Sequence, residues 1–134
     1  MYKDVEKSLK IIEEKSREYW GEEGGFSGTI REFKKGDITE LREYYRVNYP
    51  VNGVNFVELN DGELLTEILD LANFVPRDSA IKLVSQLLVS ITKSIHYTHA
   101  FKARCYKDGY NDQLHIAFVS DREINELFLY WSPD

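Results

Sequence analysis

The residues best suited to chemistry in this sequence are its single cysteine, Cys105, and a nearby histidine, His115. A thiol beside an imidazole can act as a nucleophile with its general base. Both residues lie in a segment that we expect to form a β-hairpin, so they would meet only as cross-strand neighbours on one side of it. No Asn or Asp in the local sequence is placed to orient the imidazole. We therefore expect a small buried Cys105 and a surface His115, and a small enzyme with a Cys105/His115 site is the alternative.

A zinc site is the second possibility in this hairpin, because His96 and His99 also lie there. Zinc requires ligands that converge on one point. On a strand, the odd separation of His96 and His99 would direct them to opposite faces. His99 and Cys105 would share a face, but six residues of strand span about 20 Å. We therefore predict no metal site and no cofactor.

Carboxylates could also do chemistry, since Glu63, Glu67 and Asp70 would follow one helix face at positions i, i+4 and i+7. Clustered oxygens attract divalent cations, but the sequence has no calcium-loop spacing, and a helix face opposite an apolar stripe is normally solvated. The sequence also lacks the Gly-x-Ser-x-Gly motif and the phosphate-binding loop Gly-x-x-x-x-Gly-Lys-Ser/Thr. We predict that the protein is not an enzyme.

The charge of the chain favours a protein partner. The net charge is −6, and the interval from Val47 to Pro76 contains acids but no Lys or Arg. A phosphate-binding surface would need the opposite sign, so we predict no direct binding of nucleic acid. Complementary charge would instead steer a basic protein towards this interval. The alternative is that the acidic residues only keep the protein soluble.

Tyrosines beside this interval could anchor such a partner, since aromatic residues often dominate binding energy. The alternative is that they belong to the core of the sheet. The predicted partner-binding residues are Tyr44, Tyr45, Tyr49, Glu58, Asp61, Glu63, Glu67 and Asp70.

The chain that must position these residues has 134 residues, of which 43% are hydrophobic and 30% charged, as expected for one globular domain spanning residues 1–134. A single cysteine excludes an internal disulfide framework and favours a reducing compartment. The first residues are too charged for a signal peptide, and no segment is apolar enough to predict a membrane span. We therefore expect a cytoplasmic protein.

The strongest helix signal covers Ser79–Ile95, where apolar residues repeat with the period of one helical face. Asp78 is its predicted N-cap. Ile81 and Val89 add apolar surface outside this face, which predicts a helix enclosed on more than one side. A second helix, Glu63–Val75, would form an αα-hairpin with it on the sheet.

The pattern near the N-terminus predicts a helix from about Lys3 to Tyr19. The tail from Asp121 fits either a helix or a strand, and we favour a helix. The clearest alternation of strand residues is Leu41–Tyr49, and Asn52-Gly53 after it is the preferred pair for a two-residue hairpin turn. The predicted strands are Phe26–Phe33, Leu41–Tyr49, Val54–Leu59, His96–Tyr106 and Gln113–Ser120.

These elements predict an α+β fold: an antiparallel sheet of about five strands, with the N-terminal helix and the central αα-hairpin packed mainly on one face. Small acidic α+β proteins without catalytic motifs include bacterial immunity proteins, which neutralise nuclease toxins, and phage inhibitors of nucleic-acid-acting defence enzymes. The likeness is one of size, charge and missing chemistry. We expect a non-catalytic module that binds and inhibits a basic, nuclease-like toxin; the alternatives are a phage-type inhibitor, an adaptor subunit and the small enzyme.

Overall fold

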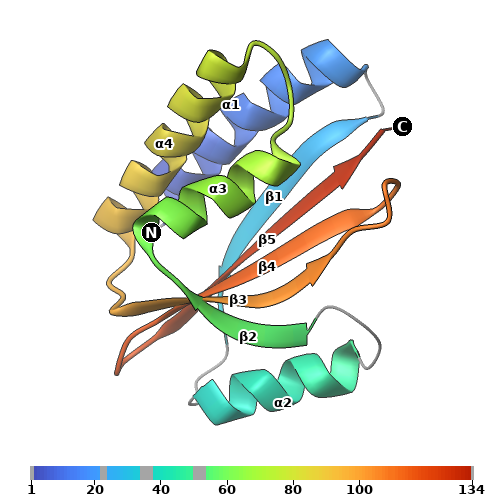
Figure 1. The fold of residues 1–134 in the computed structure, drawn as a ribbon. Coiled ribbons are helices and arrows are strands. Elements are labelled where there is room, and N and C mark those ends of the chain that lie inside the picture. The colour runs from blue at the N-terminus through green and yellow to red at the C-terminus, as the bar shows by residue number, and fades with distance from the viewer. Residues whose placement is uncertain (1, 22–23, 34–37, 50–53, 134) are drawn as a thin grey trace.

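The computed structural model describes residues 2–21, 24–33, 38–49 and 54–133. Its centre is a five-stranded antiparallel sheet with the order β1-β5-β4-β3-β2 (Figure 1). The strands are β1 (Gly25–Glu32), β2 (Val54–Leu59), β3 (His99–Tyr106), β4 (Asp112–Val119) and β5 (Ile124–Ser132). The helices are α1 (Lys3–Trp20), α2 (Ile38–Asn48), α3 (Asp61–Leu71) and α4 (Arg77–Ser94).

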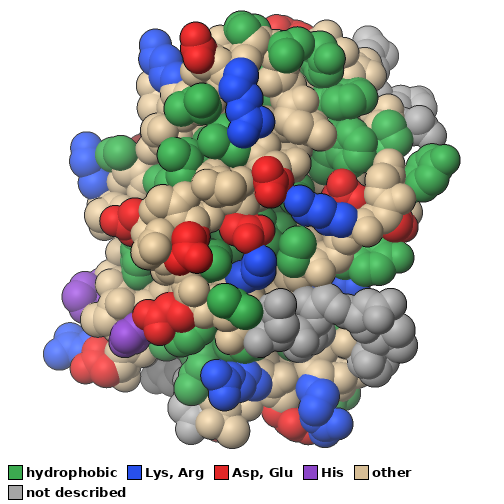
Figure 2. Space-filling model, viewed as in Figure 1, with side chains coloured by type: hydrophobic (Ala, Val, Ile, Leu, Met, Phe, Trp, Pro, Cys, Tyr) green, Lys and Arg blue, Asp and Glu red, His purple; other side chains and the backbone are tan. Residues whose placement is uncertain are grey.

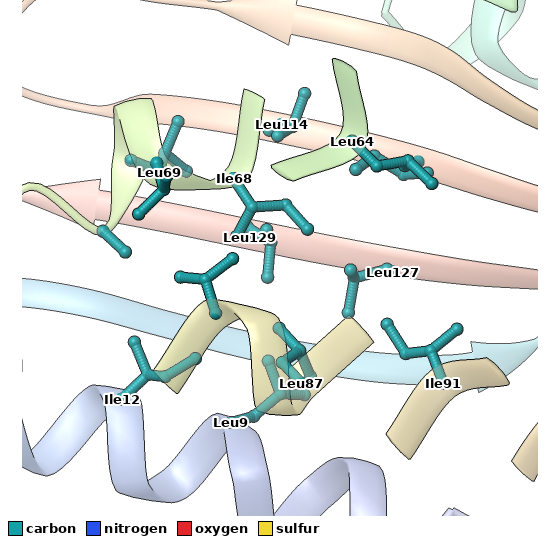
Figure 3. Close-up of a cluster of buried hydrophobic side chains, with 14 of the residues drawn as sticks. Leu9, Ile12, Leu64, Ile68, Leu69, Leu87, Ile91, Leu114, Leu127 and Leu129 are labelled. Carbon is teal, nitrogen blue, oxygen red and sulfur yellow. The ribbon is translucent and has the colours of Figure 1, made fainter. Parts of the chain in front are cut away.

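Three of the helices, α1, α3 and α4, cover one face of the sheet, and α2 lies against the other face beside β2 (Figure 1). The predicted α+β fold, with an N-terminal helix and an αα-hairpin on one face of an antiparallel sheet, is confirmed. The main core lies between the three helices and the sheet (Figure 3). Side chains from every one of these layers meet there: Leu9, Ile12, Leu64, Ile68, Leu69, Leu87, Ile91, Leu114, Leu127 and Leu129.

Helix α4 carries the predicted apolar stripe, and Val84, Leu87 and Ile91 are fully buried. Two details of the prediction are wrong. The N-cap residue is Pro76, and Asp78 lies inside the first turn. There its negative charge still interacts favourably with the positive end of the helix dipole. Ile81 and Val89 are 37% and 52% exposed, so the outer side of α4 is open to solvent, although α1 and α3 flank the helix.

Helix α3 begins earlier than predicted because Asn60 caps it. The Asn60 side chain accepts a hydrogen bond from the backbone N–H of Glu63, and the Glu63 carboxylate accepts one from the backbone N–H of Asn60. This capping box satisfies two backbone donors at the start of the helix. The helix ends at Leu71 rather than Val75, which is exposed.

The predicted strand Leu41–Tyr49 is wrong, because this segment forms α2. Leu41 and Tyr45 alternate as in a strand, but they are also one helical turn apart, and both are fully buried. Strand β2 consequently pairs with β3 instead of forming a hairpin with this segment. The predicted turn at Asn52-Gly53 lies outside the described residues.

The helix favoured for the tail from Asp121 is also wrong, because the tail forms β5 between β1 and β4. Both faces of this strand are covered: Leu127 and Leu129 lie in the main core, and Ile124 lies in the smaller apolar cluster beneath α2. A strand buried on both faces loses the simple alternation that distinguishes it from a helix.

Candidate functional site

The predicted acidic residues lie mainly on α3. Asp61, Glu63 and Asp70 are exposed, Glu67 is half-buried, and Glu58 is exposed on the edge strand β2. Acidic side chains gather on the molecular surface over this helix (Figure 2). The buried side of α3 holds it against the sheet, and the capping box fixes its first turn. The structure therefore presents the acids of α3 on a firmly packed element.

Basic residues from β3 and the turn after it partly neutralise this surface. Lys102 Nζ lies 2.7 Å from Glu67 Oε1, and Lys107 Nζ lies 3.5 Å from Asp70 Oδ2. The hydrogen bond to Glu67 raises the pKa of Lys102, so this lysine stays charged near neutral pH. The sequence interval that predicted an acidic surface contained no base, and these two lysines come from a distant part of the chain. The negative charge that remains unbalanced is concentrated at the start of α3, at Asp61 and Glu63.

Glu58, the acid predicted on β2, contacts a histidine of the neighbouring strand. Its Oε2 atom lies 2.9 Å from His99 Nδ1, and both side chains are more than half exposed. The pair therefore lies at the open edge of the sheet, where solvent weakens any electrostatic contribution.

The predicted tyrosines are not beside the acids of α3. Tyr44 and Tyr45 lie on α2 and Tyr49 directly after it, on the opposite face of the sheet. Tyr45 is fully buried, and Tyr44 and Tyr49 are half-buried against its ring. The predicted residues therefore form two separate groups, and Tyr45 has no surface to offer a partner.

Cys105 and His115 do not form a site, because their side chains lie on opposite sides of the sheet. The alternative of an enzyme that uses this pair is therefore wrong. A β-bulge lies between Lys102 and Arg104, so His115 pairs with Arg104 and Cys105 pairs with Leu114. The extra residue reverses the side on which later residues project. Cys105 consequently packs against the main core, and His115 lies on the α2 side. Burial raises the pKa of the Cys105 thiol, which disfavours the reactive thiolate.

The same bulge corrects the expected side-chain alternation along β3. Phe101 contacts Phe56 and His99 on the α2 side of the sheet, whereas Cys105 packs on the other side. His99 and Cys105 therefore do not share a face. The predicted surface position of His115 is also wrong, because this residue is only 2% exposed.

A polar cluster beneath α2 was missed by the sequence prediction. Its centre is Glu126 of β5, which is 4% exposed. One carboxylate oxygen accepts a hydrogen bond from the Tyr45 hydroxyl, and the other lies 2.7 Å from Nε of Arg31 on β1. His115 Nδ1 of β4 lies 3.4 Å from both the Tyr45 hydroxyl and Glu126 Oε2. These contacts join α2 to three strands of the sheet.

Arg104 of β3 extends this buried polar cluster. Its guanidinium carbon lies 4.5 Å from the ring centre of Tyr49 and 5.3 Å from that of Tyr106. Its Nη1 donates a hydrogen bond to Gln113. Arg104 Nε and His115 Nε2 are buried and have no hydrogen-bond partner among the described residues.

Burial of His115, together with the positive charges of Arg104 and Arg31, lowers its pKa from 6.5 to about 4. The imidazole is therefore neutral at pH 7, and its contact with Glu126 is not an ion pair. Carboxylate, imidazole and phenol groups can transfer protons, but Tyr45, His115 and Glu126 are almost completely buried. In this arrangement they join α2 to the sheet and are closed to solvent.

Within the described ranges, no group of three or more His, Cys, Asp or Glu residues could hold a metal ion. None of the helices described is sufficiently long and apolar to cross a membrane. In comparisons with known protein families, curated proteins and solved structures, nothing matches the chain.

Proposed function

We propose that this protein binds and blocks a basic protein, in the manner of an immunity protein that neutralises a nuclease-like toxin. The observation that carries the proposal is the acidic surface of α3, where Asp61 and Glu63 remain without an ion pair among the described residues after Lys102 and Lys107 pair with Glu67 and Asp70. Charge complementarity would steer a basic partner towards this surface. The same surface would suit an inhibitor of a nucleic-acid-acting defence enzyme.

The way α3 is held supports binding by a preformed surface. Leu64, Ile68 and Leu69 bury its inner side, and Asn60 caps its first turn. A surface that is already ordered loses less conformational entropy when a partner binds. The structure also places the described His–Glu–Tyr contacts inside the fold, which supports a role that is not catalytic.

Co-expression with the protein encoded by the gene next to this one tests the proposal. If that neighbour is a toxin, we expect this protein to restore growth, and the purified pair should form a complex. Association should slow as the salt concentration rises from about 0.05 to 0.5 M, because salt screens exposed charges. A toxin that remains active and unbound in the presence of this protein would contradict the proposal.

The double variant Asp61→Asn/Glu63→Gln tests the proposed surface. Gln at position 63 can still complete the capping box, so the variant removes two charges and keeps the helix start. The matched control Glu6→Gln/Glu14→Gln removes two charges from exposed positions of α1. We expect only the first variant to slow association. Equal effects would show that net charge, and not α3, determines the rate.

A further inference from the structure

We infer that the groove between α3 and α4 receives one apolar side chain of the partner, flanked in that partner by a basic and an acidic residue. The inference rests on the proposed function, since the partner is the protein that the acidic surface attracts. The two helices lie side by side over the sheet (Figure 1).

The groove is apolar and small. It is lined by Leu64, which is buried, by Leu88 and Tyr97, which are half-buried, and by Val89, which is 52% exposed. Its volume is about 290 Å³. Sites for drug-sized ligands usually have volumes of about 300–1,000 Å³. The groove therefore suits a single anchoring side chain better than a larger free ligand.

The outer side of α4 lacks the cover that its sequence predicts. Ile81 and Val89 are both exposed, although their pattern indicates a helix enclosed on more than one side. Val89 is itself part of the groove lining, so the exposed apolar surface of α4 continues into the groove, and a continuous apolar surface of this kind is typical of an interaction site. A partner bound over the groove would provide the missing cover for Val89.

Two opposite charges flank the groove and define the partner further. Asp61 is the first residue of α3, and Lys93 lies in the last turn of α4. Neither side chain has an ion pair or a side-chain hydrogen bond with another residue in the described part of the chain. Asp61 is therefore available to a basic residue of the partner, and Lys93 to a carboxylate.

The test is an NMR titration of the full chain with three synthetic peptides of equal length. The first peptide has a central leucine between a lysine and a glutamate, the second has alanine in place of the leucine, and the third has leucine between two glutamates. We expect the first peptide to shift the amide signals of Leu64, Leu88 and Val89. The alanine peptide should bind about tenfold more weakly, because burial of the leucine side chain is lost. The third peptide should also bind more weakly than the first.

Matched substitutions identify the binding position. Val89→Asp should reduce binding of the first peptide by about the same factor as the loss of the leucine. Val47→Asp is the control, since Val47 is 61% exposed on α2, across the sheet from the groove. Both variants should keep the thermal stability of the parent, because both valines are exposed.

Equal affinity for the leucine and alanine peptides, or signal shifts confined to α1 or α2, would overturn the inference. Shifts at Val89 that depend on protein concentration without any peptide would also overturn it, since a second copy would then occupy the groove. If the toxin complex forms and Val89→Asp leaves it unchanged, the groove is wrong and the proposed function stands. If the peptides bind as expected and the toxin does not, only the proposed function fails.

Discussion

The two faces of the sheet are held to their helices in different ways. Beneath α1, α3 and α4 the contacts come from one large apolar cluster. Beneath α2 a small apolar cluster, centred on Leu41 and Tyr45, lies beside a polar cluster. The polar cluster consists of the buried Tyr45, His115, Glu126 and Arg104 and the half-exposed Arg31. Apolar contacts are non-directional and tolerate small shifts, whereas buried hydrogen bonds require defined partners. The first face should therefore respond to lost volume, and the second to lost hydrogen bonds and to pH.

The largest effect is expected for Leu87→Ala in α4. Leu87 is fully buried in the main core, so its truncation should leave a cavity and reduce the free energy of unfolding by about 2–5 kcal/mol. Val89→Ala is the control on the same helix and should cost less than about 0.5 kcal/mol, as is usual for exposed positions. Urea denaturation measures both. Similar losses for the two variants would mean that the main core does not depend on α4 in this way.

A decrease in pH should reduce the stability of the folded protein through protonation of His115, which lies on the α2 side of the sheet. The pKa of this residue is about 4 in the folded protein and 6.5 normally, so the unfolded chain binds more protons between these values. Stability should therefore fall as the pH decreases from about 6.5 to about 4, by roughly 2–4 kcal/mol from this residue. The groups that face the imidazole are Arg31, Arg104, Glu126 and the tyrosines 45 and 49.

The variant His115→Gln separates this effect from the titration of carboxylates in the same range. Its free energy of unfolding should depend less on pH between 6.5 and 4 than that of the parent protein. The comparison uses denaturation curves at several pH values, so any constant loss of stability in the variant cancels. Parallel pH profiles for the two proteins would disprove the role assigned to His115.

The contact between Tyr45 and Glu126 should give the smallest of the three effects. Tyr45→Phe and Glu126→Gln should each reduce the free energy of unfolding by about 1–3 kcal/mol, because each disturbs a buried hydrogen bond. Arg31 is half exposed and stays hydrated, which limits the cost of removing its carboxylate partner. In the double variant the losses should not add, with a difference of more than about 0.5 kcal/mol. Additive losses would show that the two residues act independently.

The sequence predicts the first face of the sheet well and the second poorly, for a physical reason. The apolar stripes of α1, α3 and α4 repeat every helical turn, so each could be recognised from a short window. Helix α2 lacks such a clear signal. Leu41 and Tyr45 are four residues apart, a spacing that places them on the same side of a helix and also on the same side of a strand. Only the packing of both residues against the sheet distinguishes the two.

The buried polar cluster could not be predicted from local sequence patterns, because its members lie far apart in the chain. Tyr45 is 81 residues from Glu126 and 70 from His115, and Arg31 is 95 residues from Glu126. A single acid in a strand made mostly of apolar residues, such as β5, is a weak sign of a buried partner. The neutralisation of Glu67 by Lys102 was missed for the same reason, since it depends on how α3 lies over β3.

The position of β5 has a consequence for the order in which the chain can fold during synthesis. Among the described residues, the first strand, β1, is joined to the sheet only through β5, with Gly25 opposite Ser132. During translation, α1 and β1 leave the ribosome long before their only strand neighbour exists. Until β5 is made, β1 and β4 each present an unpaired edge, the kind of surface on which chains aggregate. A chain whose synthesis stops before residue 124 would therefore expose the two edges, one on β1 and one on β4, that β5 covers in the completed sheet.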